Sequence, residues 1–382
     1  MKKPIRILSS EMDILAEIDN YESMFFNRSW YGIGAIELRI NRYKKYTDTL
    51  VKDNLVLIGS DLNKVFIIKH REIELDENGK ITENWLIKGF ALKSIVAQRI
   101  TMPPTYTAYD NQSGSAETVM KRFINNNLVN PTNPMRKIPQ LVIATDFQRG
   151  VHMTYASRFK NLAEEISTLS LSSKLGWEVT LDLTNKKWVF DVVEGRNLTV
   201  GQFINPPVIF SPQFESLKSL HYTQSDLNYK NLAIVAGLGE GVERRIIEVG
   251  GYAAIKRHEI FIDARDIAEV DEEERPIPEP QIIKALTDRG QQQLNEFMQE
   301  EFLEGQILTN SPFKYQQEYN LGDIITIQNT DWSISMDARI TDVKEVYETS
   351  GFSIEATFGN NRPTLIQKIK QELSQVSGEV RR

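Results

Sequence analysis

Two stretches near the two ends of this chain share one pattern of short β-strands. The first opens on residues 53–58 (DNLVLI) and closes on 85–90 (WLIKGF), and the second opens on 322–327 (GDIITI) and closes on 354–359 (IEATFG). A second strand and a hairpin lie between the opening and the close of each stretch, and the two spans are nearly equal. The pattern predicts two related β-modules in one chain. Their sequence identity is low, so a chance likeness between two β-meanders is the alternative.

Composition limits what such a chain is able to do. A length of 382 residues predicts two to four domains, and 41% hydrophobic residues are enough to form their cores. The net charge of −7 argues against binding nucleic acid through its phosphates. Cysteine is absent, which excludes disulfides, thiolate metal sites and cysteine nucleophiles. We find no signal peptide and no apolar run of membrane-spanning length, so we expect a protein made in a cytoplasm that has no stable membrane association.

The order of sequence patterns divides the chain into six segments. Strand patterns dominate both ends, and an acidic, proline-rich run (DEEERPIPEP) precedes a long helical pattern. The predicted segments are an N-terminal β-module (1–104), a mixed α+β inserted domain (105–204), a β region (205–270), an acidic and proline-rich linker with a helix (271–303), a C-terminal β-module (304–360) and a short helix with a polar tail (361–382). The expected fold class is therefore multidomain, β-rich α+β.

Helical periodicity marks three longer helices. Ser115 is a suitable N-cap for a helix whose apolar face extends to Leu128. A second apolar face runs over 159–169, and a third helix is predicted at about 281–303. The apolar stripe of the third helix, interrupted by a glycine, comprises Ile283, Leu286, Leu294, Phe297 and Phe302.

Alternating and turn-forming residues mark strands and hairpins. Residues 35–41 alternate apolar and polar side chains, which is typical of a half-buried strand. Asn78-Gly79 is a strong hairpin turn signal. Strands at 177–182 and 188–192 are expected to form a hairpin that turns at Asn185.

The glycine-rich run Gly237-Leu238-Gly239-Glu240-Gly241 follows an apolar strand, as a dinucleotide-binding loop does. Val242 stands where the third glycine of that motif belongs, and the next residues read as a strand. A dinucleotide site needs a helix N-terminus for the pyrophosphate. We therefore interpret the run as a glycine-rich β-turn and predict no cofactor.

No residue pattern selects a catalytic or metal site. The histidines are scattered, without the helical pair of a zinc peptidase. Glu164-Glu165 and Glu300-Glu301 are adjacent, so each pair is expected to point apart on a solvated face. The acidic run 271–274 lacks the alternate-residue ligand spacing of a calcium loop. We predict no catalytic residue and no metal ligand. The four histidines are His70, His152, His221 and His258.

Several motifs, taken in order, resemble a known family. The glycine turn, then 243–245 (ERR) and 257–267 (RHEIFIDARDI), are similar to the core of the siphophage tail-hub family. The resemblance covers about 25–370. Further segments that fit it are 116–120 (AETVM), 175–177 (LGW), 190–197 (FDVVEGRN), 210–212 (FSP), 229–231 (YKN), 321–324 (LGDI) and 337–343 (DARITDV).

The resemblance implies a structural protein of a phage or prophage tail, not an enzyme. Members look like the central hub of contractile-phage baseplates, with two β-barrel-like modules per chain around a channel. Three chains would offer six quasi-equivalent modules, related by rotations of about sixty degrees, to a sixfold tail tube. The implied partners are further copies in a homotrimer, a distal tail or tail tube protein, and a tape-measure, tip or fibre protein. DNA would only pass through, and the protein would lie at the virion tail tip.

Two other functions stay open at this stage. A carbohydrate-binding tail protein would stack exposed aromatics on host-wall sugars, with Trp30, Tyr31, Tyr106 and Tyr109 as candidates. A wall-degrading enzyme is the weaker alternative. The third helix, around Leu294, Phe297 and Phe302, is a candidate for packing between subunits, and the core of the chain itself is the alternative for the same side chains.

Overall fold

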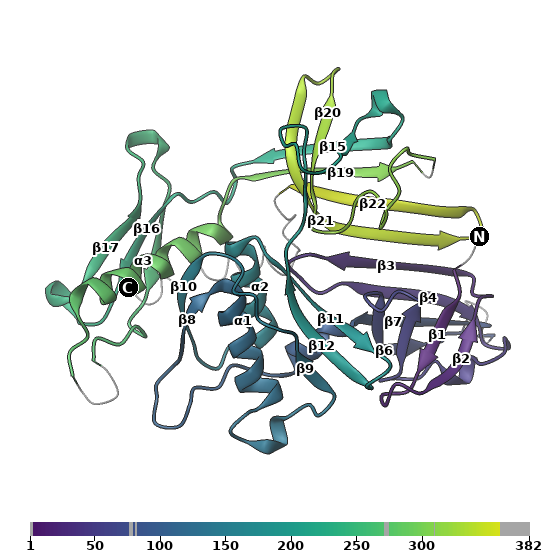
Figure 1. The fold of residues 1–382 in the computed structure, drawn as a ribbon, viewed down its shortest axis with the longest axis horizontal. Helices are drawn as coiled ribbons and strands as arrows, with labels where there is room; N and C mark the ends of the chain where they lie inside the picture. The colour runs from purple at the N-terminus through teal and green to yellow at the C-terminus, as the bar shows by residue number, and fades with distance from the viewer. Residues whose placement is uncertain (1–2, 76–78, 81, 271–274, 309, 360–382) are drawn as a thin grey trace.

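A computed structural model describes residues 3–75, 79–80, 82–270, 275–308 and 310–359 of the protein (Figure 1). Most of the elements are strands, and several separate sheets are joined by a few helices. The predicted class, β-rich α+β with several domains, is confirmed. The predictions for the acidic run 271–274 and for a helix at 361–382 lie outside the described residues.

One large sheet, antiparallel except where β13 and β14 pair with β20, runs through both similar stretches. Its strand order is β15-β19-β22-β21-β3-β4-β7-β6-β5-β1-β2, and β20, with β13 and β14 beside it, pairs with β21. None of the described sheets closes into a barrel, which corrects the expectation of barrel-like modules. The strands are β1 (Ile5–Leu8), β2 (Ile14–Ile18), β3 (Ser23–Ser29), β4 (Ala35–Asn41), β5 (Leu55–Ile58), β6 (Val65–Glu72), β7 (Asn84–Ala91), β13 (Asn197–Leu198), β14 (Ile209–Phe210), β15 (Leu217–Ser225), β19 (Glu300–Ile307), β20 (Ile324–Asn329), β21 (Ile334–Glu348) and β22 (Gly351–Gly359).

The two similar stretches fold into the same three-stranded meander, β5–β6–β7 and β20–β21–β22, which we call the first and second repeat. Asp53 N donates to Ile68 O over 2.8 Å, and Gly322 N donates to Ile340 O over 2.8 Å. Asp53 and Gly322 both have left-handed backbone, with φ of 72° and 91°. In both repeats the pairing of the second with the third strand shifts by one residue immediately after Ile68 or Ile340. The predicted relation between the stretches is therefore confirmed in topology and register.

The inserted domain packs two helices between small sheets. Ser115 caps α1 (Ala116–Ile124), since its hydroxyl accepts a hydrogen bond from Thr118 N over 3.2 Å. A π-helical turn continues α1 to Val129, and α2 (Leu162–Ser173) follows an Asn161 cap. The predicted N-cap, helices and hairpin are confirmed. The strands here are β8 (Asp110–Ser115), β9 (Leu141–Ile143), β10 (His152–Ser157), β11 (Gly176–Asp182) and β12 (Lys187–Val193).

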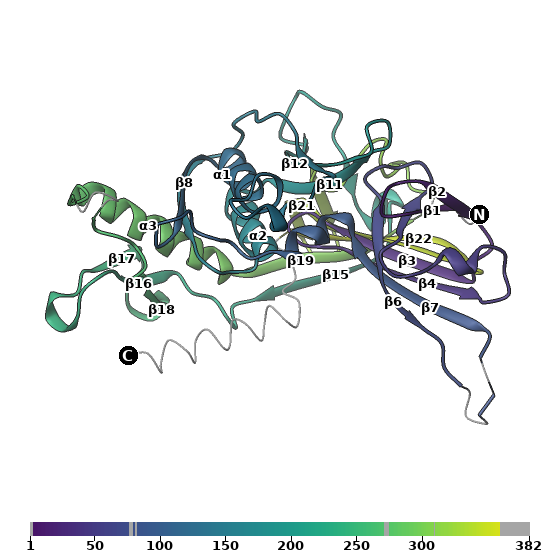
Figure 2. The same cartoon turned by 90° about the horizontal axis from the view of Figure 1, so that it is seen from below.

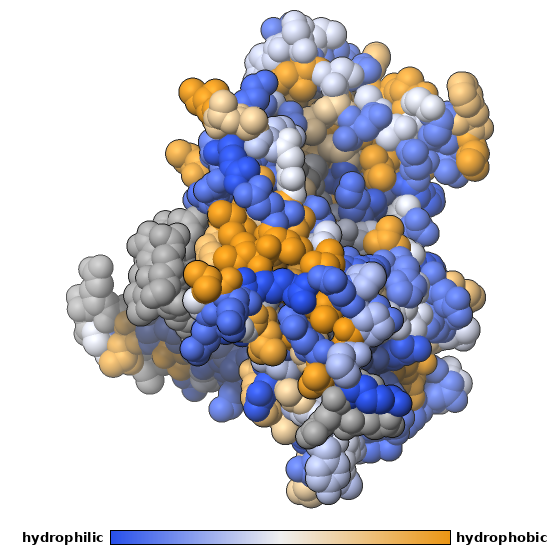
Figure 3. Space-filling model, turned by 90° about the vertical axis from the view of Figure 1, so that its left-hand side faces the viewer, coloured by the Kyte–Doolittle hydropathy of each residue, from blue (hydrophilic) through white to orange (hydrophobic). Residues whose placement is uncertain are grey.

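A smaller unit, inserted between β15 and β19, lies at one end of the molecule (Figure 1). It consists of β16 (Leu232–Ala236), β17 (Ile246–Gly250) and β18 (Glu259–Asp263), covered by α3 (Glu279–Glu296). A Cβ at Gly290 would lie 2.7 Å from Val249, so this glycine lets α3 approach the sheet. Figure 3 shows an apolar area on the side of the molecule that carries this unit. None of the described helices is long and apolar enough to cross a membrane.

The third predicted helix is shorter than expected. It ends at Glu296, and Phe302 lies in β19, where Leu303, Gly305 and Ile307 alternate toward the core. Leu294, Phe297 and Phe302 are all buried within this chain. Intramolecular core is therefore the role that these side chains have, and we withdraw them as candidates for packing between subunits.

The two repeats differ in how far their hairpins extend. β6 and β7 form a long hairpin that projects away from the rest of the molecule (Figure 2). Its predicted turn residue Asn78 lies outside the described residues. β21 and β22, in contrast, turn within two residues, between Glu348 and Gly351.

Candidate functional site

The long strand β21 joins the two repeats. Its first half pairs with β20 inside the second repeat. Its second half, 342–347, pairs with residues 29–24 of β3, which belongs to the strands that extend the first repeat. The junction of the repeats is thus a backbone ladder, and the side chains around it form the candidate site.

Trp30 follows β3 and fills a narrow gap between two glycines. The side chain is buried, and a Cβ would lie 2.6 Å from the indole at Gly176 and 2.2 Å from it at Gly322. The indole Nε1 donates to Lys174 O over 3.4 Å, and the Arg339 guanidinium lies 5.8 Å from the ring centroid. Because Gly176 opens β11 and Gly322 opens the second repeat, one indole contacts both the inserted domain and the second repeat.

A second contact fixes the segment after β12 to the start of the second repeat. A Cβ at Gly195 would lie 1.8 Å from Gly322 O, so glycine is required at this close approach. The buried Asp323 carboxylate accepts hydrogen bonds from Arg196 N over 2.8 Å and from the Arg196 guanidinium over 2.6 Å. It also accepts one from Asn320 N over 2.8 Å. Charge-assisted bonds of this kind are stronger than neutral ones, so the contact is firmly held.

Four motifs of the resemblance therefore meet at this junction. Residues 175–177, 190–197, 321–324 and 337–343 are far apart in the sequence, yet all supply atoms to the contacts of Trp30 and Asp323. The motifs around 243–245 and 257–267 lie elsewhere, in the small unit covered by α3. The glycine turn there leads through one short 3-10 turn (Gly241–Glu243) into strand β17, as predicted, and not into an α-helix.

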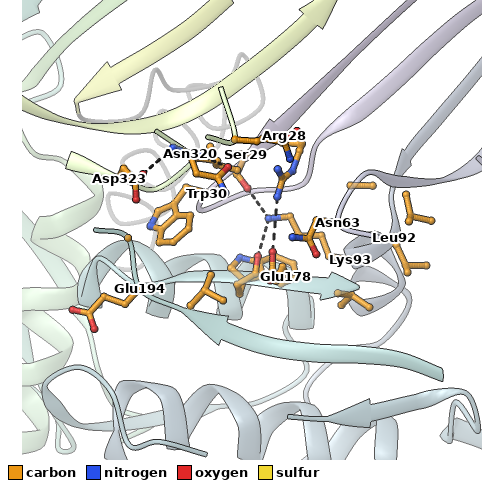
Figure 4. A pocket seen from close by; sticks show the side chains of 18 of the residues that line it. Arg28, Ser29, Trp30, Asn63, Leu92, Lys93, Glu178, Glu194, Asn320 and Asp323 are labelled. Atoms are coloured by element: carbon orange, nitrogen blue, oxygen red, sulfur yellow. Dashed lines mark hydrogen bonds and ion pairs between the residues drawn. The ribbon is translucent and has the colours of Figure 1, made fainter. Parts of the chain in front are cut away.

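A polar pocket of about 430 Å³ opens beside the junction (Figure 4). Lys93 lies at its base, where the ammonium donates to Ser29 O over 2.7 Å and to Trp177 O over 3.1 Å. Burial lowers the pKa of Lys93 to about 7. Arg28 approaches the Glu178 carboxylate to 3.9 Å, and burial raises the pKa of Glu178. Charged groups from β3 and β11 thus face one another where three parts of the fold meet.

A buried ion pair provides a further tie between the repeats. Lys64, in the turn between β5 and β6, forms a salt bridge with Glu345 of β21, and both side chains are almost completely buried. The Lys64 ammonium also donates to the Gln316 side chain over 2.8 Å, and Tyr347 Oη donates to Glu345 over 2.7 Å. Burial lowers the pKa of Lys64. Sequence patterns gave no signal for this pair, because its members are 281 positions apart.

The aromatic residues predicted for sugar stacking do not form one surface. Trp30 and Tyr31 are buried at the junction and are not accessible to a ligand, because the core covers them. Tyr106 is fully exposed and Tyr109 is half-buried. Two of the four candidates are therefore corrected.

The part of the chain that the structure describes offers no cluster of side chains for catalysis by a bound metal ion. Within 3–75, 79–80, 82–270, 275–308 and 310–359, no three histidine or acidic side chains come close enough to hold a metal ion. His70 lies beside Glu72, with Nε2 and the carboxylate 2.8 Å apart on an exposed strand. The junction is built from interlocking packing, backbone pairing and buried charge, which is chemistry suited to holding parts of a structure together.

Asp342, opposite Ser29 in the ladder, makes the stability of the junction depend on pH. Burial raises the pKa of Asp342 to about 7, above the value of about 4 for an unfolded chain. The protonated carboxyl therefore stabilises the fold fully below about pH 4, and this contribution is lost as the pH rises through about 7. We expect wild-type stability to fall more between pH 5 and 7.5 than that of Asp342→Asn, measured as the urea midpoint. Asp331→Asn, at an exposed position, is the control. Equal pH dependence of wild type and Asp342→Asn would contradict this assignment.

The fold is that of phage and prophage tail proteins. The prophage MuSo2 43 kDa tail protein from Shewanella oneidensis has 11% identity and a TM-score of 0.56, over 93% of this chain and 98% of that one. A tail protein from Neisseria meningitidis MC58 has 9% identity and a TM-score of 0.55, over 94% and 97%. Prophage tail protein gp18 from Listeria monocytogenes EGD-e has 11% identity and a TM-score of 0.53, over 98% and 99%.

The sequence itself supplies the family. The model of the Siphovirus ReqiPepy6 Gp37-like protein family matches residues 4–360, so the chain belongs to that family. No curated protein sequence gives a significant match. The resemblance to siphophage tail proteins inferred from the motifs is therefore confirmed, and the protein is of the phage and prophage tail class.

Proposed function

We propose that this tail protein is a structural hub of the tail tip, in which three copies form a ring around a channel for DNA. The observation that carries the proposal is the matched register of the two repeats in one chain. Two copies of a unit per chain allow three chains to present six similar units. A sixfold tail tube meets such a ring without a symmetry mismatch.

The joint between the repeats supports a ring over an isolated pair. β3, from the first half of the chain, adds to an edge of β21 in the second half, so different surfaces of the two repeats meet. A joint of this kind is heterologous, and heterologous joints repeat until they close into a ring or extend as a filament. In the proposed ring the repeats follow one another at rotations of about sixty degrees around the threefold axis.

The proposed partners follow from that position. A distal tail or tail tube protein would contact one face of the ring, and a tape-measure, tip or fibre protein the other. The net charge of −7 is consistent with a channel that lets DNA pass without holding it. The protein would be made in the host cytoplasm and carried at the virion tail tip.

Mass in solution tests the ring. Light scattering on the purified chain is expected to give three times its mass of 43.9 kDa, with a closed species that does not grow at higher concentration. A strictly monomeric species at high concentration would count against the hub. The control is the same measurement at high salt, since a ring held by backbone pairing and apolar contacts is expected to persist there.

Incubation with purified cell wall tests the two alternatives. A hub without a reaction of its own is expected neither to release glycan fragments nor to remain on the wall. Release would indicate an enzyme, and retention without release a carbohydrate-binding protein. Tyr106→Ala is the informative variant for retention, because Tyr106 is the fully exposed member of the predicted aromatic set.

A further inference from the structure

The likeness of the two halves extends beyond the repeats. From the middle strand outward the order is β6-β7-β4-β3 in one half and β21-β22-β19-β15 in the other. Ile68 of β6 pairs with Gly89 of β7, and Ile340 of β21 pairs with Phe358 of β22. Because Ile68 and Ile340 are equivalent, Gly89 and Phe358 are equivalent too.

Following the paired residues across the sheet in the same way matches the next two strands of each half. Ile36 of β4 pairs with Gly89, and Leu303 of β19 pairs with Phe358. Ile36 then pairs with Phe26 of β3, and Leu303 pairs with Tyr222 of β15. β15 is therefore the counterpart of β3, with Tyr222 in the position of Phe26.

One of the two possible joints is formed inside the chain. β3 pairs through residues 24–29 with 342–347 of β21. The counterpart of the β21 edge is the segment 70–75, and the counterpart of the β3 edge is 220–225. No described strand pairs with either of these edges, since β15 ends the sheet and β5 pairs with β6 only at 65–67. The two edges that a second joint of this kind would need, 70–75 and 220–225, are therefore both available for pairing.

We propose that β15 of one copy adds as an antiparallel strand to β6 of the next copy and to the three residues that follow β6, with residues 225–220 opposite 70–75. This inference rests on the proposed ring and specifies how its chains join. It places Tyr222 opposite Ile73, as Phe26 lies opposite Glu345 inside the chain. The occupant of each open edge is a second copy of this chain.

The side chains across this register are complementary. Glu74 falls opposite His221, and Leu75, which is 58% exposed in a single chain, falls opposite the half-buried Leu220. No pair places like charges opposite each other, and directly opposed pairs are the main side-chain contribution to strand pairing. A shift by one residue would turn every side chain of one strand to the other face. The remaining pairs are His70–Ser225, Arg71–Gln224, Glu72–Thr223 and Ile73–Tyr222.

The ladder between β3 and β21 also shows which opposed residues exchange backbone hydrogen bonds and which do not. Trp30 N donates to Thr341 O over 2.8 Å, so the next pair, Ser29–Asp342, is a non-hydrogen-bonded pair, and every second pair after it is too. In the proposed joint, Glu72–Thr223 and Glu74–His221 are therefore non-hydrogen-bonded pairs. Opposed residues of such pairs have Cα atoms about 4.5 Å apart, which is within disulfide range.

Absence of cysteine from the chain allows a clean cross-linking test. Two full-length double variants are each oxidised and analysed on a denaturing gel without reductant: Glu72→Cys/Thr223→Cys and Glu74→Cys/His221→Cys. We expect covalent dimers and trimers from both. Glu72→Cys/Gln224→Cys is the matched control and is expected to stay uncross-linked, because residue 224 would face the other side of the sheet. All four positions used in the two test pairs are exposed or half-buried, and far-ultraviolet circular dichroism checks that each variant is folded.

Each outcome separates this inference from the proposed function. Trimers in light scattering without cross-links in either test pair would overturn the β15–β6 joint and leave the ring standing. Cross-linking in the control pair in place of the test pairs would overturn the register. A folded, strictly monomeric chain that forms no cross-link would overturn both the joint and the ring.

Discussion

Lys64→Met is expected to destabilise the protein by about 3–5 kcal/mol, because it leaves the Glu345 carboxylate buried without its cation. Removing one member of a buried pair is costly, since the remaining charge has lost its hydration on folding and no longer has an ion pair to compensate for that loss. The Tyr347 hydroxyl still donates to Glu345, which offsets part of this loss. Urea unfolding at fixed pH measures the change.

The double variant Lys64→Met/Glu345→Met distinguishes lost charge pairing from lost packing. Replacing both members of a buried pair by apolar groups of similar size is often close to neutral, so we expect the double variant to be more stable than the single one. Lys69→Met is the control, since its salt bridge with Asp53 is solvent-exposed and is worth about 1 kcal/mol or less. A single variant no less stable than this control would contradict the assignment of the pair as a tie between the repeats.

Trp30→Ala is expected to cost about 3–5 kcal/mol, as large-to-small changes in a core do. The indole fills the gap between Gly176 and Gly322, and neither glycine has a side chain with which to occupy the empty volume. The cavity would open where the second repeat and the inserted domain meet, so both are expected to unfold at lower urea concentration. Urea unfolding followed by far-ultraviolet circular dichroism measures the change in stability without relying on tryptophan fluorescence.

Trp332→Ala provides the matched control. Trp332 lies in the turn between β20 and β21 and is 48% exposed, so its removal is expected to change stability far less. Comparable losses from the two variants would show that the junction gap is not the source of the effect. Gly322→Ala tests the same contact from the other side and is expected to destabilise by overpacking against Trp30.

Local patterns predicted local structure well. The alternation at 35–41, the Ser115 cap and the hairpin at Asn185 all depend on neighbouring residues, and all three are found. Phe302 was assigned to the wrong element because its spacing from Phe297 is compatible with a helix. The strand-like alternation over residues 303–307 (LEGQI) was the contrary signal in the sequence.

The junction was beyond such patterns because its parts are distant in sequence. Trp30 looked available for sugar stacking, and only the approach of Gly176 and Gly322 explains its burial. Lys93 lies beside Ser94 in the run LKSIV, where a lysine is expected at the surface, although its partners are the buried carbonyls of Ser29 and Trp177. The motif resemblance did identify the glycines and Asp323, but it did not place them together.

The ladder between β3 and β21 has a mechanical consequence. The two repeats are coupled by backbone hydrogen bonds and not by a flexible linker, so neither can swing without breaking that ladder. Force applied to one repeat would therefore be transmitted directly to the other through this ladder. Any hinge-like opening movement is expected in the parts outside the sheet, namely the inserted domain and the unit of β16–β18 and α3.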